Sequence, residues 1–416
     1  MRTVSYNEIL QPLAELYGVE YADLDAELGG RFKGFIARRL REAWEDAFWP
    51  GLTRVEKRRF APVYLDSKTY AAGEFVYYPP AKAYFQCLIA GSGNAPTDAN
   101  GNTDENYWAK AGVSWSGNDW ASGTSYVVGE VVYYRPSNQW YQCISATSSA
   151  DPGTAAGLTN WGLLRPFRKI LQSQPTEATV ATTAGVYSAP DVVLTLAEGI
   201  ELAVGDRIAV AGVTPAEYNG EFAVVAPLHS VLVSYEPGDD PGTYSGAGTV
   251  RKIYEEPGLV RGVYSKDPEA HSDFVELDFQ EVDNGWLVPQ APVEVWLEFR
   301  KVAPLLTGSA YSAATTYTAG EQVLFTNGST KNFYNCKVAT AQGESPTTDP
   351  MKWELVELPY IFQTFIVYAA LSDALKMDGN HAAAGATMKI ARESLEEEQV
   401  KQWNLQPQRN RVAVAY

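Results

Sequence analysis

The sequence is poor in the residues that most thiol and metal chemistry needs. Its only cysteines, Cys87, Cys143 and Cys336, lie far apart and form no CxxC pair, and none of its three histidines belongs to an HExxH pattern. Disulfide frameworks and zinc sites depend on closely spaced ligands of these kinds. We therefore expect no disulfide, no metal and no cofactor, with the three thiols reduced and buried.

Long apolar runs are missing as well. No stretch approaches the roughly 20 residues that a membrane span needs. The first residues, MRTVSYNEIL, lack the apolar segment of a signal peptide. These features predict no membrane association and a protein that is made and kept in a cytoplasm.

The sequence also lacks the common catalytic motifs. It has no GxSxG nucleophile elbow, no Walker A loop and no GxGxxG run that opens a helix. The adjacent carboxylates Asp239 and Asp240, and those at 396–398, fall in a turn and on a polar helix face, where solvation explains them. We therefore predict that the chain is not an enzyme.

The charge balance is strongly acidic, with a formal net charge of −17. Tight wrapping of nucleic acid rests on Lys and Arg that neutralise phosphates, so this balance argues against it. Segment 31–60 is an exception, because nine Lys and Arg there face four Asp and Glu. The segment is either a docking face for an acidic partner or passing DNA, or simply a solvated helix face.

What the sequence does contain is a pattern that occurs three times. Each copy has a Tyr, a Gly three residues later, a hydrophobic strand, an aromatic pair that leads to a Cys, a Pro and a closing Trp. The copies run through Tyr70, Gly73, Cys87 and Trp108; Tyr126, Gly129, Cys143 and Trp161; and Tyr317, Gly320, Cys336 and Trp353. The Gly and Cys are 14, 14 and 16 residues apart, which suits two short strands and a turn. Each copy is therefore predicted to be a small β-module with its Cys and closing Trp in the core.

Two further β-regions are expected. Segment 179–253 contains DVVLTL, RIAVAGV, EFAVVA and SVLVSY between Gly- and Pro-rich turns, which predicts a small sandwich or barrel. Apolar and charged residues alternate in FVELDFQ and in VEVWLEFR, and Asn284-Gly285 lies between these two runs. This pattern predicts that the two strands pair antiparallel with each other.

Helical patterns occur near the two ends of the chain. Apolar residues recur at steps of three and four over 32–47, and Pro50 ends that pattern. Two more stripes cover 361–375 and 384–395, with Gly379 between them. We expect these last two to form a helix hairpin, and the end helices and the β-pair to pack together as one core.

The three copies resemble the small chitin-binding modules of carbohydrate-binding families 5 and 12. The likeness rests on YAAGEFVYY, YVVGEVVYY and YTAGEQVLF and on the closing Trp. In that family, a Trp-rich pair of aromatic residues just after the YxA position stacks on sugar rings. The residues here are Leu88-Ile89, Ile144-Ser145 and Lys337-Val338, so the resemblance implies the fold without the sugar-binding platform. Tyr134 and Trp140 are the candidate residues if glycan binding does occur.

The flanking segments resemble a different family, the head-to-tail adaptor proteins of tailed bacteriophages. Residues 35–60, FIARRLREAWEDAFWPGLTRVEKRRF, are similar to the N-terminal helix of those proteins, and residues 360–399 are similar to their closing helix hairpin. VWLEFRKVAP and GDRIAVAGVTPAEYNGEF lie between these segments and are also phage-like. Four segments in a consistent order carry the likeness.

This resemblance implies a structural virion protein at the head-to-tail interface, made in the host cytoplasm. Its expected partners are the portal protein, further copies of itself in a dodecameric ring, and the next tail or neck protein, with DNA passing through the lumen without sequence-specific binding. The candidate partner-binding residues are Arg38, Arg39, Arg41, Trp403, Arg409, Arg411 and Tyr416. The alternative function is binding of chitin or cell-wall glycan through the three modules.

The predicted fold class is a multidomain α+β protein in which terminal helices and a β-hairpin form an adaptor core with small all-β modules inserted. The expected divisions are 1–63 for the N-terminal helical part, 64–113 and 114–168 for the first two modules, 169–254 for the sandwich or barrel, 255–307 for the β-hairpin, 308–357 for the third module, and 358–416 for the helix hairpin and tail.

Overall fold

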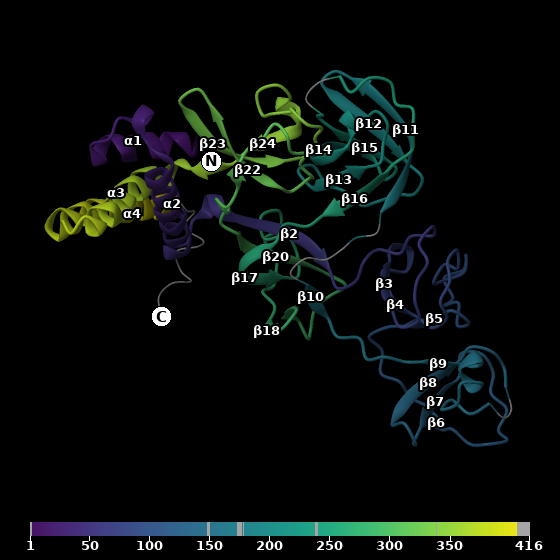
Figure 1. The fold of residues 1–416 in the computed structure, drawn as a ribbon. Coiled ribbons are helices and arrows are strands. Elements are labelled where there is room, and N and C mark those ends of the chain that lie inside the picture. The colour runs from purple at the N-terminus through teal and green to yellow at the C-terminus, as the bar shows by residue number, and fades with distance from the viewer. Residues whose placement is uncertain are drawn as a thin grey trace.

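The computed structural model describes residues 2–147, 150–172, 177, 179–237, 240–337 and 339–405. Within this part the protein is mixed α and β, mostly β, with four α-helices and many small sheets (Figure 1). The α-helices are α1 (Asn7–Tyr17), α2 (Ala26–Asp46), α3 (Gln363–Met377) and α4 (His381–Leu405). Short 3₁₀ helices cover Tyr21–Asp23, Pro50–Leu52, Pro79–Ala81, Gly157–Thr159, Ala216–Tyr218, Pro350–Lys352 and Tyr360–Phe362.

The helices gather at one end of the molecule, as Figure 1 shows. α2 begins at Asp25, whose carboxylate accepts from the Leu28 N–H at 2.7 Å, and it ends before Pro50, as predicted. α3 and α4 form the predicted hairpin. It turns at Gly379, whose φ of +77° is the left-handed conformation that favours glycine. Helix α1 was not predicted, because only Ile9, Leu10, Leu13 and Ala14 mark its short buried stripe.

Segments from the two ends of the chain meet in a small sheet beside the helices. Strand β1 (Thr3–Ser5) pairs antiparallel with β25 (Glu357–Pro359). This pairing holds the start of α1 next to the start of α3. Both ends of the described chain therefore contribute to one helical cluster.

A three-stranded sheet lies at the centre of the molecule. Its order is β17 (Pro257–Tyr264), β20 (Glu294–Lys301) and β2 (Thr53–Arg59), with both pairings antiparallel. β20 buries Val295, Leu297 and Phe299 on one face, as its alternation predicted.

The predicted pairing of FVELDFQ with VEVWLEFR is wrong. The partners of β20 are β17 and β2, and FVELDFQ lies along the other edge of β17, where the Leu277 N–H donates to the Val263 carbonyl at 2.7 Å. Asn284-Gly285 does form a turn, but it joins β18 (Gln280–Val282) to β19 (Gly285–Leu287), which pairs with β10 (Ile170–Gln172). Alternation identifies a strand and its inner face, whereas its partner depends on segments far away in the sequence.

Segment 179–253 forms a closed six-stranded barrel, one of the two predicted architectures. Its strands are β11 (Val180–Ser188), β12 (Asp191–Leu196), β13 (Arg207–Ala211), β14 (Gly220–His229), β15 (Leu232–Tyr235) and β16 (Thr249–Ile253), in the order β11-β12-β15-β14-β13-β16. Closure leaves no open sheet edge.

The three copies of the repeated pattern fold as small sheets, here called repeat 1 (64–113), repeat 2 (114–168) and repeat 3 (308–357). Repeat 1 contains β3 (Phe75–Tyr78), β4 (Ala83–Cys87) and β5 (Trp108–Lys110). Repeat 2 contains β6 (Asn118–Asp119), β7 (Val131–Tyr134), β8 (Gln139–Cys143) and β9 (Trp161–Leu163). Repeat 3 contains β21 (Ser309–Ala310), β22 (Gln322–Asn327), β23 (Thr330–Cys336) and β24 (Trp353–Leu355). The three cysteines are free and buried, and the three closing tryptophans are buried, as predicted.

The predicted single core of helices and β-pair is not what the structure shows. The helices pack with Phe333 of repeat 3, whereas the central sheet packs in a separate cluster with Tyr77 and Tyr84 of repeat 1. Repeat 2 lies at the end of the molecule farthest from the helices and next to repeat 1 (Figure 1). Repeats 1 and 3 are therefore part of the two main cores, and repeat 2 is the peripheral one.

Candidate interaction surfaces

The three repeats share the same internal hydrogen bonds. In each, the hydroxyl of the first Tyr accepts a main-chain N–H five residues upstream, from Leu65 at 2.6 Å, Ala121 at 2.8 Å and Ser312 at 2.8 Å. The Gly N–H donates to the carbonyl of the Cys at 2.7 to 2.8 Å in all three. The Gly has φ values of +94°, +92° and +91°. The YxxG spacing therefore reflects a backbone turn that only glycine adopts without strain.

One aromatic position of the repeated pattern was not predicted from the sequence. Six residues before the first Tyr, each repeat has another large aromatic residue, which is Tyr64, Trp120 or Tyr311. Tyr64 stacks on Tyr70 at 5.4 Å between ring centroids, and Tyr311 stacks on Tyr317 at 5.6 Å. The constant offset of six residues was the signal that could have shown it.

Repeats 1 and 2 pack on each other through the position that resembles the sugar-binding platform. Leu88 and Ile144 occupy that position, and both are buried together with Ala109 and Leu164. An added Cβ at Gly162 would collide with the Leu88 side chain, so the approach is close. The platform position therefore serves an interface between modules here.

The two candidate glycan residues differ in their surroundings. Tyr134 is buried in the core of repeat 2, with edge contacts to Trp120 and Tyr141. Trp140 is half-buried and lies 5.2 Å from the half-buried ring of Tyr133. Only Trp140 of the predicted pair presents ring surface to a ligand.

Four of the nine basic residues in segment 31–60 lie on strand β2 rather than on a helix face. Arg58 and Glu56 on β2 form an ion pair at 2.7 Å, and both side chains are almost completely buried. Arg59 pairs with Glu294 at 2.9 Å and with Glu201 of the barrel. Burial alone would lower the pKa of Arg59, but Glu201 and Glu294 outweigh it and hold the pKa above its ordinary value. These charges are neutralised inside the chain. The Arg59–Glu201 ion pair joins the central sheet to the barrel.

The helical half of the segment remains more open. Arg38 and Arg39 on α2 contact the Asp373 carboxylate on α3 at 2.5 and 2.6 Å. The Arg39 side chain is 13% exposed and that of Arg38 is 59% exposed, while Arg41 is also exposed. Burial tends to raise the pKa of Asp373, but the hydrogen bonds from Arg39 and Arg38 lower it overall. Arg39 thus fixes α2 to α3, and Arg38 and Arg41 face solvent.

The C-terminal candidates are placed only in part. Trp403 on α4 is 40% exposed, and Ile390 and Val400 on the same helix are also exposed. Arg409, Arg411 and Tyr416 lie outside the described residues. The described end of α4 therefore exposes the apolar side chains of Val400 and Trp403 among charged ones such as Lys401.

No protein-family model, curated protein or solved structure matches this chain. In the part of the chain that the structure describes, no group of three or more His, Cys, Asp or Glu side chains is arranged to hold a metal ion. No helix among the described residues is both long and apolar enough to cross a membrane.

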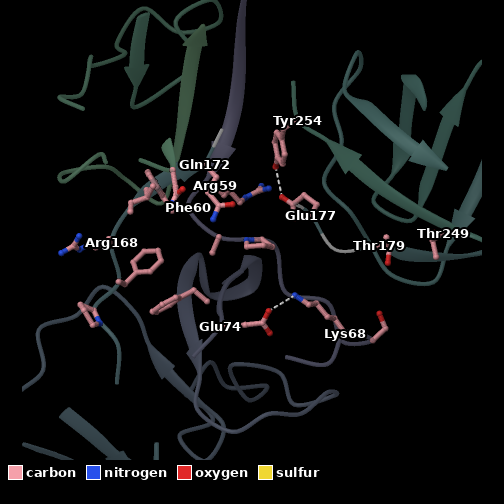
Figure 2. Close-up of a pocket in the computed structure, with 18 of the residues that line it drawn as sticks. Arg59, Phe60, Lys68, Glu74, Arg168, Gln172, Glu177, Thr179, Thr249 and Tyr254 are labelled. Atoms are coloured by element: carbon pink, nitrogen blue, oxygen red, sulfur yellow. Dashed lines mark hydrogen bonds and ion pairs between the residues drawn. The ribbon is translucent and has the colours of Figure 1, made fainter. Parts of the chain in front are cut away.

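A cavity of about 1040 Å³ opens where repeat 1, the chain that leaves repeat 2 and the barrel approach one another (Figure 2). Phe60, Phe75 and Phe167 contribute its aromatic lining. The Tyr254 hydroxyl donates to Glu177 at 2.8 Å, and burial together with this carboxylate raises the pKa of Tyr254 well above its ordinary value. The described lining contains no His or Cys. Lys68 pairs with Glu74 across this cavity and Arg59 pairs with carboxylates outside the lining, so we assign no chemistry to it.

Proposed function

We propose that this chain is a structural, non-enzymatic virion protein of a tailed bacteriophage, a head-to-tail adaptor whose copies form a ring between portal and tail. The observation that carries the proposal is a pair of different exposed surfaces on the helical end: arginines beside two glycines on α2, and isolated apolar side chains among charged ones on α4. A head-to-tail ring contact joins two unlike faces of successive subunits, so it requires such a pair.

The α2 face combines exposed cations with unexplained glycines. Arg31, Arg38 and Arg41 are exposed on it, with Arg31 paired to Glu27 and Arg38 to Asp373. Gly30 and Gly34 lie one helical turn apart, and an added Cβ at either would meet nothing within 4 Å. Glycine inside a helix costs about 1 kcal/mol relative to alanine, and packing within one subunit does not require it at these positions. Close approach by a neighbouring subunit supplies a reason for both residues.

α4 exposes isolated apolar side chains along its length, among charged ones such as Lys389 and Glu393. Ile390, Val400 and Trp403 are exposed on it, and the small residues Ala382 and Ala386 are exposed near its start. Desolvation of such residues against a neighbour is the main favourable contribution in subunit association. The resemblance of segments 35–60 and 360–399 to adaptor proteins supports the same assignment, because these segments contain α2 and the α3–α4 hairpin.

The test is co-expression of the full chain with the product of the adjacent portal-like gene, followed by native mass measurement and electron microscopy. A closed ring stacked on the portal is expected. Ile390→Asp combined with Val400→Asp should prevent ring closure, because each change places a charge in the apolar contact. Val186→Asp, at a residue that is exposed on the barrel, is the matched control and should assemble normally. A chain that stays monomeric beside an assembled portal would refute the proposal.

The carbohydrate-binding alternative has less support. Leu88 and Ile144 at the platform position are buried in an interface, and Tyr134 is buried in a module core. Stacking on a sugar requires an accessible ring face, which leaves the half-buried Trp140 and Tyr133 as the ring surfaces in question.

A further inference from the structure

Each repeat carries a pair of large side chains at one fixed position on adjacent strands. Direct cross-strand partners are Tyr77 and Tyr84 in repeat 1, Tyr133 and Trp140 in repeat 2, and Leu324 and Phe333 in repeat 3. Cross-strand neighbours lie on the same face of a sheet. The pair therefore marks an equivalent face on all three modules.

In repeat 1 this face is covered by the central sheet. Tyr77 and Tyr84 are each 5% exposed and belong to the cluster of that sheet. The Tyr84 hydroxyl accepts from the Phe60 N–H at 3.1 Å and donates to the Val293 carbonyl. The Arg59 guanidinium lies 5.0 Å from the centroid of the Tyr77 ring. The covering surface thus presents main-chain groups, apolar atoms and a cation.

In repeat 3 the same face is covered by the helices. Phe333 is completely buried, and its ring meets that of Tyr6 edge-on at 4.9 Å. The Lys33 ammonium of α2 lies 5.9 Å from the Phe333 centroid. The covering elements differ completely from those of repeat 1, yet an apolar surface with a cation over the aromatic ring covers both.

In repeat 2 the pair has the same geometry, but no other part of the described chain covers it. Its ring centroids are 5.2 Å apart and the ring planes meet at 52°, against 5.4 Å and 51° in repeat 1. Both Tyr133 and Trp140 remain half-buried. Trp140 and Trp115 both pack against the buried cluster between repeats 1 and 2, so the uncovered face continues an existing protein interface.

Among the described residues of repeat 2, no cation lies over these rings, and the nearby Arg135 is held in an ion pair with Asp119 at 2.5 Å. Parallel bridges place Val63 beside Tyr77 and Asp119 beside Tyr133, so these two residues are equivalent. Four residues before Val63, repeat 1 is preceded by Arg59, and four residues before Asp119, repeat 2 has Trp115. The position that supplies the cation in repeat 1 is therefore an aromatic residue in repeat 2.

We propose that the Tyr133–Trp140 face of repeat 2 docks onto another protein, through an apolar surface that presents a Lys or Arg side chain to the rings. The two equivalent faces are both closed by protein, and a cation suits a chain with a net charge of −17. A second copy of this chain fits less well, because its corresponding surfaces already cover its own repeats 1 and 3. The 52° angle between the rings gives no flat platform for a sugar.

The test begins with the full chain carrying a photo-crosslinking amino acid in place of Tyr133, co-expressed with the products of the adjacent genes. We expect a crosslink to one of these proteins, within a peptide that contains Lys or Arg. Capture alone is not decisive, so that protein is then purified and its affinity for the chain is measured. Trp140→Ala should weaken binding by about tenfold or more, and added salt should weaken it further.

Matched variants separate docking from folding. Val127→Ser changes a residue of repeat 2 that is 61% exposed, and it should leave the affinity unchanged. Trp140→Phe keeps an aromatic ring and should retain most of the binding while Trp140→Ala does not. A thermal melt of each variant establishes that repeat 2 remains folded.

Three results would overturn the proposal. The first is a crosslink from position 133 only to further copies of this chain. The second is retention of the chain on insoluble chitin that Trp140→Ala abolishes. The third is assembly of the chain with its neighbours while position 133 crosslinks to nothing. The proposed docking face of repeat 2 does not depend on the formation of an adaptor ring. A partner at repeat 2 without ring formation would refute the adaptor function alone, and a ring with an uncovered Tyr133 would refute the docking face alone.

Discussion

Gln86 and Gln142, which occupy equivalent positions in repeats 1 and 2, each donate a side-chain N–H to the main chain of the other repeat. Gln86 reaches the Leu163 carbonyl at 2.7 Å, and Gln142 reaches the Glu105 carbonyl at 2.9 Å. The Gln86 side-chain oxygen also accepts from the Arg165 N–H at 2.8 Å. The two repeats therefore face each other with an approximate twofold relation, and each one satisfies buried main-chain groups of the other.

The first prediction concerns this reciprocal contact. Gln142→Ala should lower the free energy of unfolding by about 1–3 kcal/mol, because the carbonyls of Glu105 and Trp108 lose their donor in a buried interface. Chemical denaturation of the full chain measures the change. Ser122→Ala, at an exposed residue of the same repeat, should stay within about 0.5 kcal/mol of the wild type. Equal effects of the two variants would contradict the role given to Gln142.

The second prediction compares two equivalent glycines. Gly320→Ala should cost about 1–2 kcal/mol, since its φ of +91° strains any other residue and an added Cβ meets nothing within 4 Å. Gly129→Ala should cost more, because the added Cβ would also overlap the Glu105 carboxylate. Calorimetric melting of both variants gives the comparison, and a smaller cost at Gly129 would show that Glu105 moves away freely.

The third prediction concerns acid stability. The pKa of Asp373 is lowered in the folded chain, so its contribution to stability is present above the unfolded pKa of about 3.9 and is lost as the pH falls through the folded pKa. Asp373→Asn should reduce the free energy of unfolding by about 1–3 kcal/mol near neutral pH. The difference from the wild type should shrink as the solution is acidified below about pH 4. A difference that is constant with pH would show that the carboxylate charge is not responsible.

The fourth prediction separates a core tryptophan from a surface one. Trp161→Ala should destabilise the chain by about 3–5 kcal/mol, because it leaves a cavity and removes the bond from the indole N–H to the Ala150 carbonyl at 2.8 Å. Trp403→Ala removes a residue that is 40% exposed, and it should leave the melting temperature nearly unchanged while weakening ring assembly. Thermal melts and native mass measurement test the two halves. A large loss of stability in Trp403→Ala would remove that residue from the apolar contact.

The fifth prediction concerns the thiols. Burial raises the pKa of Cys87 to about 11 and also raises that of Cys143, so little thiolate forms near neutral pH and access is restricted. Both should react slowly with iodoacetamide in the folded chain and quickly after denaturation, as peptide mass mapping would show. Rapid labelling of Cys143 alone would indicate that repeat 2 opens independently of repeat 1.

Much of the local structure could be predicted from the sequence. Three β-modules could be identified from Tyr70, Gly73 and Cys87 and from their counterparts in the other two copies. The Gly adopts a positive φ in a turn and the Cys is small and buried, so these residues keep nearly the same spacing in each copy. Periodicity located α2 and the α3–α4 hairpin for a similar reason, since the side chains that share a face follow the repeat of the backbone. α1 escaped because four buried residues in one short stretch give too weak a signal.

Long-range packing decided what these local patterns could not. The alternation in VEVWLEFR correctly placed Val295, Leu297 and Phe299 on the buried face, but β2 and β17 became its partners. Arg58 and Arg59 look like surface charges in the sequence, and only the approach of Glu56, Glu201 and Glu294 makes them interior. The pairing of β2 with β20 and the contacts of Arg59 with Glu201 and Glu294 join residues more than a hundred positions apart, which no local pattern encodes.

The sequence by itself determined the three modules, their cores and the pair of large side chains on the outer face of each. Only the tertiary structure decided that the pair is covered by a sheet in repeat 1, by helices in repeat 3 and by nothing described in repeat 2. The physical reason is that hydrogen bonds and side-chain spacing within about 50 residues build a module. The surface that covers the outer face of a module and removes it from water depends on where in the chain that module is inserted.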